Sequence, residues 1–248
     1  MTGGPGTGKT TTVVRLLALL QSIALTKDAG RPLQIRLAAP TGKAAARLKE
    51  SISGAIDKLP AFVQDNPALK ASISNEVITL HRLLGTRPDS RMFRHDARNP
   101  LPLDVLVVDE GSMVDLEMMA AMLLALPVHA RLILLGDKDQ LASVEAGSVL
   151  GELCRRAQQG HFLPETAHWI KAMTGNSIDE ALLDAGGLLL DQHIVMLRES
   201  RRFDASSGIG QLAGAVNAGD AGRIHAVWAD SYSDLFRHDL PNLEDGRL

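Results

Sequence analysis

The sequence of 248 residues has little cysteine, few aromatic side chains and no long apolar run. Cys154 is the single cysteine, which excludes a disulfide framework and a cysteine-based zinc site. Aromatic residues make up 3% of the chain, so a single-strand nucleic-acid surface cannot depend on many stacked rings. No apolar stretch reaches the roughly 18 residues that a membrane-spanning helix needs, and no signal-peptide pattern is present. We therefore expect a cytoplasmic protein without a membrane partner.

The charge balance is close to neutral, with a formal net charge of -3. This value argues against a uniformly basic nucleic-acid binder, although a local basic groove is compatible with it. Hydrophobic residues at 45% and charged residues at 22% are ordinary for a globular protein that buries one sizeable core.

The most specific motif lies at the amino-terminal end and has the pattern G-x-x-x-x-G-K-T. Such a loop turns backbone N–H groups toward a triphosphate, and the following helix points its positive end at the same anion. Lys9 is expected to contact the β- and γ-phosphates, and the Thr10 hydroxyl to hold Mg²⁺. A glycine-rich loop that only turns the chain is the alternative. The predicted ATP contacts are Gly3, Gly4, Pro5, Gly6, Thr7, Gly8, Lys9, Thr10 and Thr11.

Only Met1 and Thr2 precede this loop, whereas the motif requires a buried strand before it. We therefore expect a chain shortened at this end, with its first strand missing. The polar stretch from Arg237 to Leu248 indicates the same at the other end.

Apolar runs alternate with helix-period segments, a pattern typical of a parallel α/β sheet flanked by helices. The region 59–100 is interpreted as a variable connection with a short helical patch at 79–84, and 160–191 as weakly patterned. We predict strands at 34–39, 104–108, 131–135 and 193–197, and helices at 10–25, 42–48, 115–126, 147–159, 209–218 and 221–229.

Two acidic residues follow the buried run at 104–108. Asp109 stands where a strand-end carboxylate can hold Mg²⁺ beside Thr10, and Glu110 is placed to deprotonate the attacking water. The alternative is a surface acidic turn, which the neighbouring phosphate loop makes less favourable. The pair therefore predicts nucleotide hydrolysis.

Three further strings have both a structural and a functional interpretation. Gln140 follows the next strand and can sense a γ-phosphate, because its amide donates and accepts at once; a polar loop is the alternative. Thr41 and Lys43 open a helix suited to a phosphodiester backbone, but a capping turn explains them equally well. Arg202, beside Arg201, can stabilise transition-state charge, although a basic surface turn is the commoner role of such a run.

In this order, the motifs resemble those of superfamily 1 helicases. Within that group the strings at 37–48, 79–85 and 136–147 are similar to the RecD family, the alpha subunits of exodeoxyribonuclease V. The resemblance implies a RecA-like P-loop NTPase fold and a 5′-to-3′ DNA helicase that uses ATP and Mg²⁺ in recombinational repair of double-strand breaks. It also implies single-stranded and duplex DNA and the beta and gamma subunits as partners.

The resemblance also assigns roles to individual residues. Gln140 would couple the γ-phosphate to domain movement, and Arg202 would reach the γ-phosphate. At the position of Arg201 many members of the superfamily have a tyrosine, which is associated with stacking on the adenine ring. This chain departs from the family at that position. The implied DNA contacts are Pro40, Thr41, Lys43, Thr79 and His81.

The predicted organisation is a first motor domain at 1–160, a variable peripheral segment at 161–192 and the start of a second motor domain at 193–248. A different class remains open, a nucleotide-dependent DNA-binding or regulatory ATPase without unwinding activity. A small-molecule kinase fits poorly, because it leaves Gln140 and Arg202 unexplained. Stimulation of ATP hydrolysis by single-stranded DNA would separate the helicase from both alternatives.

Overall fold

The computed structural model describes residues 1–27, 30–87, 90–138, 140, 149–200 and 206–236. The chain forms two compact units, Met1–Arg198 and Glu199–Leu248. The second unit begins six residues after the predicted start of a second motor domain at 193, and the three predicted domain ranges stay predictions. The two units are described separately below.

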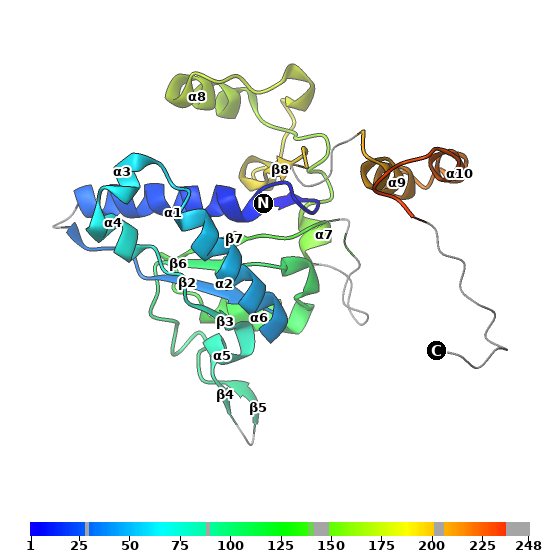
Figure 1. Ribbon diagram of the computed structural model, residues 1–248. Helices are drawn as coiled ribbons and strands as arrows, with labels where there is room; N and C mark the ends of the chain where they lie inside the picture. The colour runs from blue at the N-terminus through cyan, green and yellow to red at the C-terminus, as the bar shows by residue number, and fades with distance from the viewer. Residues whose placement is uncertain (28–29, 88–89, 139, 141–148, 201–205, 237–248) are drawn as a thin grey trace. The chain divides into compact units, whose positions relative to one another are not determined.

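A four-stranded parallel sheet lies at the centre of the first unit (Figure 1). Its order is β3 (Val77–Thr79), β2 (Ile35–Ala39), β6 (Val105–Val108) and β7 (Arg131–Leu134). Ala39 lies opposite Thr79, and Val108 lies between Ala38 and Leu134. The carboxyl ends of all four strands therefore meet at one edge of the sheet.

A second pair of parallel strands, β1 (Thr2–Gly3) and β8 (Met196–Leu197), lies beside β7. Thr2 forms an isolated parallel bridge with Gly136, and the N–H of Gly3 donates to the Gly136 carbonyl at 3.2 Å. Thr2 and Gly3, the first residue of the glycine loop, are thus held as a short strand at the same edge. The predicted strand at 193–197 is confirmed in its last two residues only.

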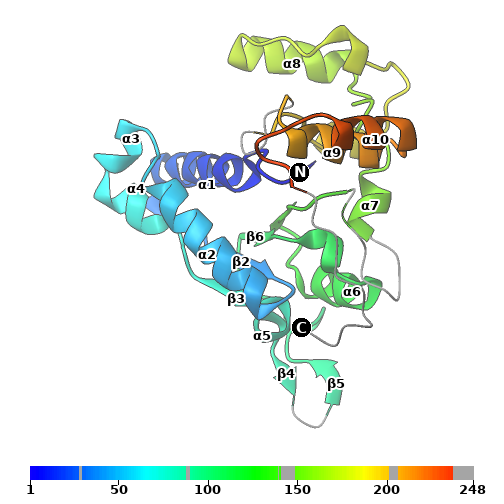
Figure 2. The same cartoon turned by 45° about the vertical axis from the view of Figure 1, so that its right-hand side comes forward.

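Alternating side chains of the strands build a core on each face of the sheet. On one face Leu37, Val105 and Val107 pack with α1 (Lys9–Thr26) and α2 (Gly42–Ile56). On the other face Leu106 and Val108 pack with α5 (Leu80–Leu84) and α6 (Leu116–Ala125). Figure 2 shows the sheet between these two groups of helices. The predicted α/β fold is confirmed, because the sheet is parallel and helices cover both of its faces.

The helix predictions at α1 and α6 are confirmed near their expected bounds, and the one at α2 is confirmed at its start, although α2 continues eight residues beyond the predicted end at 48. Helix α1 carries a buried Gln21 in its second half, and the amide of Gln21 donates to the carbonyls of Leu33 and Ser72 and accepts from the Leu33 N–H. All of this side chain's hydrogen-bonding groups are therefore used although it is fully buried. In the described parts of the chain, no helix has the length and apolarity to cross a membrane.

The interpretation of 59–100 as a variable connection is wrong in part. It contains α3 (Ala61–Gln64), α4 (Pro67–Ser72), the edge strand β3, and the hairpin of β4 (Thr86–Arg87) and β5 (Ser90–Phe93). The three residues of β3 were too few to show a strand pattern. Their strand conformation depends on pairing with β2.

The segment after β7 also differs from its prediction. The expected helix at 147–159 is described only as α7 (Val149–Leu153), and the weakly patterned region contains α8 (Pro164–Thr174), η3 (Glu180–Leu182) and η4 (Leu190–His193). Helix α8 has Pro164 in its first turn but no buried residue. Because α8 has no buried apolar stripe, no hydrophobic periodicity in the sequence indicates this helix.

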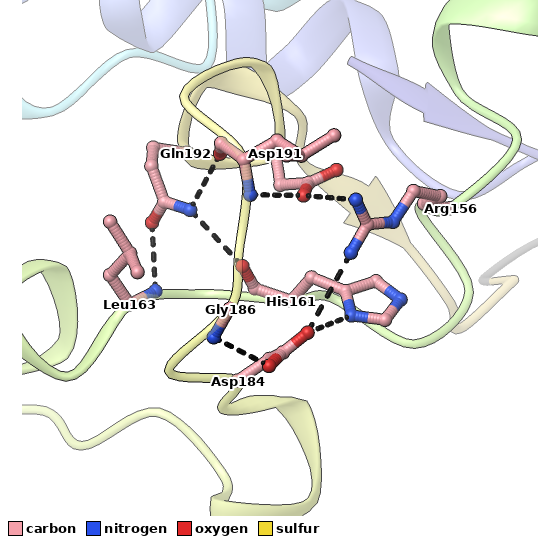
Figure 3. Close-up of polar contacts among 8 residues, drawn as sticks. Arg156, His161, Leu163, Asp184, Gly186, Asp191 and Gln192 are labelled. Carbon is pink, nitrogen blue, oxygen red and sulfur yellow. Dashed lines mark hydrogen bonds and ion pairs between the residues drawn. The ribbon is translucent and has the colours of Figure 1, made fainter.

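Polar contacts fix the segment 156–192 (Figure 3). Arg156 contacts Asp184 at 3.6 Å and the nearly buried Asp191 at 3.3 Å, and His161 Nδ1 lies 2.7 Å from Asp184. Gln192 closes the network, because its amide accepts from the Leu163 N–H and donates to the His161 carbonyl. Backbone from both ends of the segment is therefore tied together by side chains.

The second unit contains α9 (Gly208–Asn217) and α10 (Ala221–Ala229). Both predicted helices are confirmed to within one residue. Ser207 caps α9 and Asp220 caps α10, and the carboxylate of Asp234 accepts from the N–H groups of Gly208 and Ile209.

Candidate functional site

The predicted nucleotide and DNA segments converge at the carboxyl edge of the parallel sheet. The glycine loop leaves β1, Asp109 follows β6, and Gly136 follows β7. Pro40 and Thr79 stand at the ends of β2 and β3. This edge is where ligands bind in open α/β sheets.

The glycine loop has the backbone geometry of an anion cradle. Gly6 and Gly8 have φ values of 76° and 87°, in the left-handed region that only glycine adopts without cost. A Cβ added at Gly4 or Gly8 would meet no atom within 4 Å, so open space lies over both residues. The Thr7 hydroxyl donates to the Gly4 carbonyl at 2.8 Å and holds the turn closed.

Helix α1 begins at Lys9, with Gly8 as its N-cap and no side-chain cap. Its first backbone N–H groups are thus left for a ligand, and their partial positive charge favours an anion. The Lys9 ammonium donates to the carbonyls of Gly3 and Gly4, the latter at 3.1 Å. Lys9 is therefore directed back into the loop, and Thr10 follows it in the first turn of the helix.

Asp109 and Glu110 are carboxylates in a partly desolvated environment. Burial raises the pKa of Asp109, against the lowering effects of the Glu110 backbone N–H and the Lys9 charge. The pKa of Glu110 is also raised, first by burial and then by the charge of Asp109, while Lys9 and Arg47 oppose the shift. Raised pKa values at a shared site are typical of functional carboxylates.

Glu110 also has an unusual backbone conformation. Its φ of 51° is in the left-handed region, which a residue with a Cβ adopts at a cost. It caps the 3-10 turn η2 (Gly111–Met113), and the next N–H, that of Gly111, donates to the Leu135 carbonyl at 2.8 Å. The surrounding structure therefore holds this carboxylate in a strained turn.

Gln140 lies within reach of the Asp109–Glu110 turn. Its Oε1 accepts a hydrogen bond from the Ser112 hydroxyl at 2.9 Å. Ser112 is fully buried, and sequence reasoning did not identify it, since a serine in an acidic turn has no distinguishing spacing. Arg201 and Arg202 lie outside the described residues, so their predicted roles stay predictions.

The predicted DNA segment occupies the neighbouring strand ends. Thr41 caps α2 by accepting from the Ala44 N–H at 3.2 Å, and Thr79 caps α5 by accepting from the Arg82 N–H at 3.3 Å. The structure therefore confirms that Thr41 is a helix cap. In both threonines the hydroxyl oxygen accepts the capping hydrogen bond, so the O–H group can still donate to another acceptor. Pro40 ends β2, and Lys43 is exposed in the first turn of α2.

His81 is exposed on α5, and its ring lies edge-on to Phe93 with 6.1 Å between centroids. Because Ala39 is paired with Thr79, the two predicted DNA strings are adjacent across β2 and β3. The structure therefore brings together all five predicted DNA contacts on one half of the edge.

Two charged residues near Glu110 were also missed by sequence reasoning. Arg47 of α2 lowers the pKa of Glu110 and Asp137 after β7 raises it. Asp137 belongs to the string after β7 and could have been singled out by its position at a strand end. Arg47 could not, because only the packing of α2 against the sheet places it there.

The residues at this edge fit a magnesium nucleotide. The open glycine cradle, Lys9 and the uncapped start of α1 suit a triphosphate, and Thr10 with Asp109 offers the oxygen donors that Mg²⁺ prefers. The described residues contain no group of three or more His, Cys, Asp or Glu that could hold a metal. Mg²⁺ bound with a nucleotide needs few protein ligands, because phosphates and water supply the others.

Comparisons with known proteins agree with this geometry. Residues 1–146 match a family model described as an AAA domain. The chain is 46% identical over 238 residues to RecBCD enzyme subunit RecD of Haemophilus influenzae, covering 96% of the chain and 34% of that protein. RecD of Mycolicibacterium smegmatis is 46% identical over 231 residues, covering 92% and 34%. The chain thus spans about a third of the length of these relatives.

A further relative is the ATP-dependent RecD2 DNA helicase of Deinococcus radiodurans, 40% identical over 157 residues, with 63% of the chain and 18% of that protein covered. Among solved structures, Bacteroides Pif1 bound to single-stranded DNA is 18% identical with a TM-score of 0.41, covering 87% of the chain and 41% of that protein.

Proposed function

The chain belongs to the AAA domain family, with RecD subunits among its relatives, and on this premise we propose that it is the ATP-hydrolysing part of a 5′-to-3′ DNA helicase. The enzyme would translocate on single-stranded DNA and unwind duplex DNA in recombinational repair of double-strand breaks. It would act in the cytoplasm, with beta and gamma subunits like those of exodeoxyribonuclease V.

The observation that carries this proposal is the division of one sheet edge between two sets of residues. Around β6 and the glycine loop lie Lys9, Asp109 and Glu110, with the pKa of both carboxyls raised. Around β2 and β3 lie Thr41, the cap of α2 two residues after β2, and Thr79, which pairs with Ala39 at the end of β2. A nucleotide site beside a polynucleotide site is what a DNA-dependent motor requires.

In the proposed nucleotide site, the glycine loop and the start of α1 would bind the phosphates. Lys9 would turn from the Gly3 and Gly4 carbonyls toward the β- and γ-phosphates. Thr10 and Asp109 would hold Mg²⁺, which when bound neutralises charge on the phosphate oxygens. Arg202 would approach the γ-phosphate.

Glu110 would act as the general base that takes a proton from the attacking water. A raised pKa makes its carboxylate a better proton acceptor, while Lys9 and Arg47 favour the ionised form. The strained turn would hold the backbone from which this carboxylate extends, so that less of the chain needs to be ordered when the nucleotide binds.

A direct backbone link connects the two halves of the edge. The Asp109 N–H donates to the Ala38 carbonyl at 3.0 Å, and the chain continues from Ala38 through Ala39 to Pro40 and Thr41. A shift of the Asp109–Glu110 turn during hydrolysis would therefore reach the DNA segment within four residues. We propose that this link, together with Gln140, couples ATP turnover to movement on DNA.

The experiment is ATP hydrolysis by the full chain in its assembled complex, with and without single-stranded DNA. We expect DNA to stimulate hydrolysis and the Lys9→Ala variant to lose it, because the phosphates lose their cation. Hydrolysis that DNA leaves unchanged would contradict the motor function, and would favour the regulatory ATPase. Hydrolysis that survives Lys9→Ala would contradict the placement of the nucleotide.

A further inference from the structure

The Ser112 hydroxyl joins two parts of the proposed nucleotide site that are 28 residues apart in sequence. It lies on η2, directly after Asp109 and Glu110, and donates to Gln140 Oε1 at 2.9 Å. Ser112 is fully buried, whereas Gln140 is exposed. The donor, Ser112, is therefore held in place by the surrounding protein. The acceptor, Gln140, is on the surface, and this hydrogen bond restricts the orientation of its side chain.

The backbone around Ser112 is held closely against the end of β7. A Cβ added at Gly136 would lie 3.2 Å from the Ser112 backbone nitrogen, and one added at Gly111 would lie 3.2 Å from the Leu135 carbonyl. The Gly111 N–H also donates to that carbonyl at 2.8 Å. Ser112 thus has little freedom to move relative to β7. Gln140 lies in the segment that follows β7, three residues after Asp137.

The direction of the hydrogen bond determines what the glutamine can do. A glutamine amide is planar, with an acceptor oxygen and two N–H donors. Because Ser112 occupies the oxygen, the Nε2 donors are directed away from Ser112 and remain for another acceptor. Phosphate oxygens are acceptors only, so an amide presented in this way is oriented to bind one.

We propose that Ser112 is a positioning residue that holds the Gln140 amide with its donors toward the γ-phosphate. This role rests on the proposed nucleotide function. It also links the general base to the sensor, because Ser112 and Glu110 share one short turn. Displacement of that turn after hydrolysis would release or reorient Gln140.

The test is a double-mutant cycle in the full chain within its complex, with Ser112→Ala, Gln140→Ala and the double variant. We expect Ser112→Ala to lower kcat for ATP hydrolysis roughly five- to tenfold, the range that one neutral hydrogen bond allows. The affinity for ADP should be unchanged, because ADP has no γ-phosphate. In the Gln140→Ala background, Ser112→Ala should have no further effect on kcat.

Two controls separate positioning from folding. Ser112→Cys keeps the buried volume but has a weak donor, so it should also lower kcat without lowering the melting temperature. Ser72→Ala removes a hydroxyl that donates to the Leu69 carbonyl, away from the sheet edge, and should leave kcat unchanged.

The proposal would be overturned if the fold-reductions in kcat of Ser112→Ala and Gln140→Ala multiplied in the double variant. It would also be overturned if Ser112→Ala lowered the affinities for ADP and ATP equally. Wild-type protein that binds neither nucleotide would instead overturn the proposed function, so that the two failures are distinguishable.

Discussion

The two ends of strand β6 carry carboxylates in opposite electrostatic states. At the amino end, Asp104 accepts from the Gln34 N–H at 2.7 Å and contacts Arg31 at 3.2 Å, and the pKa of this carboxyl is lowered. At the carboxyl end, Asp109 and Glu110 have raised pKa values, with burial as the leading cause. Four apolar residues separate the two ends.

This difference supports a division of the strand into an end that serves stability and an end that serves chemistry. A carboxylate that is hydrogen-bonded and ion-paired stabilises the folded state in its charged form, whereas a desolvated one does not. A protein retains groups that lower its stability where function requires them. We therefore propose that the carboxyl end of β6 is the functional end and that its amino end is structural.

The largest expected effect comes from removing the proposed base. Glu110→Gln should lower kcat for ATP hydrolysis by roughly 10²- to 10⁴-fold, the contribution typical of a general base, and should keep ATP binding. Steady-state kinetics and nucleotide titration measure both. Asp104→Asn, the matched change at the other end of the strand, should leave kcat unchanged. Normal turnover in Glu110→Gln would remove the base assignment.

At the amino end of β6, a substitution should change the stability of the protein instead of kcat. Asp104→Ala leaves the Gln34 N–H without its acceptor and Arg31 without its partner, and should lower the free energy of unfolding by about 1–2 kcal/mol. Denaturant unfolding measures this loss.

The pH dependence of that stability has a defined sign. The lowered folded pKa of Asp104 means that its contribution is present above the pKa of the unfolded chain, and is lost as pH falls through the folded pKa. Equal stability of Asp104→Ala and wild type near neutral pH would show that Asp104 is not a stabilising group.

A smaller effect is expected on the DNA half of the edge. Thr41→Ala removes the cap of α2 and should cost about 1 kcal/mol of stability, and it should weaken single-stranded DNA binding several-fold if its hydroxyl also contacts a phosphate. Asn66→Ala removes the cap of α4, where Asn66 accepts from the Leu69 N–H at 3.0 Å. It should cost similar stability without changing DNA affinity, as measured by fluorescence anisotropy. Equal DNA binding by both variants would leave Thr41 with its capping role only.

The smallest effect is a gain in stability. Because the folded pKa of Glu110 is raised, its stabilising contribution is present below the unfolded pKa and is lost as pH rises through the folded pKa. Glu110→Gln, which is neutral at every pH, should therefore unfold at a slightly higher temperature than wild type near neutral pH. The difference should disappear at acid pH. A lower melting temperature at neutral pH would contradict the desolvation that the raised pKa implies.

Much of the fold could be predicted because its signals are local. The runs at 105–108 and 132–135 are apolar throughout, and Asp115 caps α6 by accepting from the Met118 N–H at 2.7 Å, as its position before the helix indicates. The glycine loop is defined by spacing alone. These features need no knowledge of distant contacts.

The features that could not be predicted depend on tertiary contacts. Strand β3 has three residues and exists through its pairing with β2, and α8 has no buried face from which a periodicity could be recognised. Ser112 and Arg47 acquire their positions near Gln140 and Glu110 only when β6, β7 and α2 are packed. The sequence thus predicted β2, β6 and β7 of the central sheet but not β3, and the roles that it indicated for the site residues stay predictions.

The measurement that tests the central claim most directly is calorimetric titration of the full chain with magnesium-loaded ATPγS. The functional assignment of the carboxyl end of β6 predicts saturable heat with wild type and Asp104→Asn, and none with Lys9→Ala. Wild-type protein that gives no heat, or Lys9→Ala that binds as tightly as wild type, would contradict it.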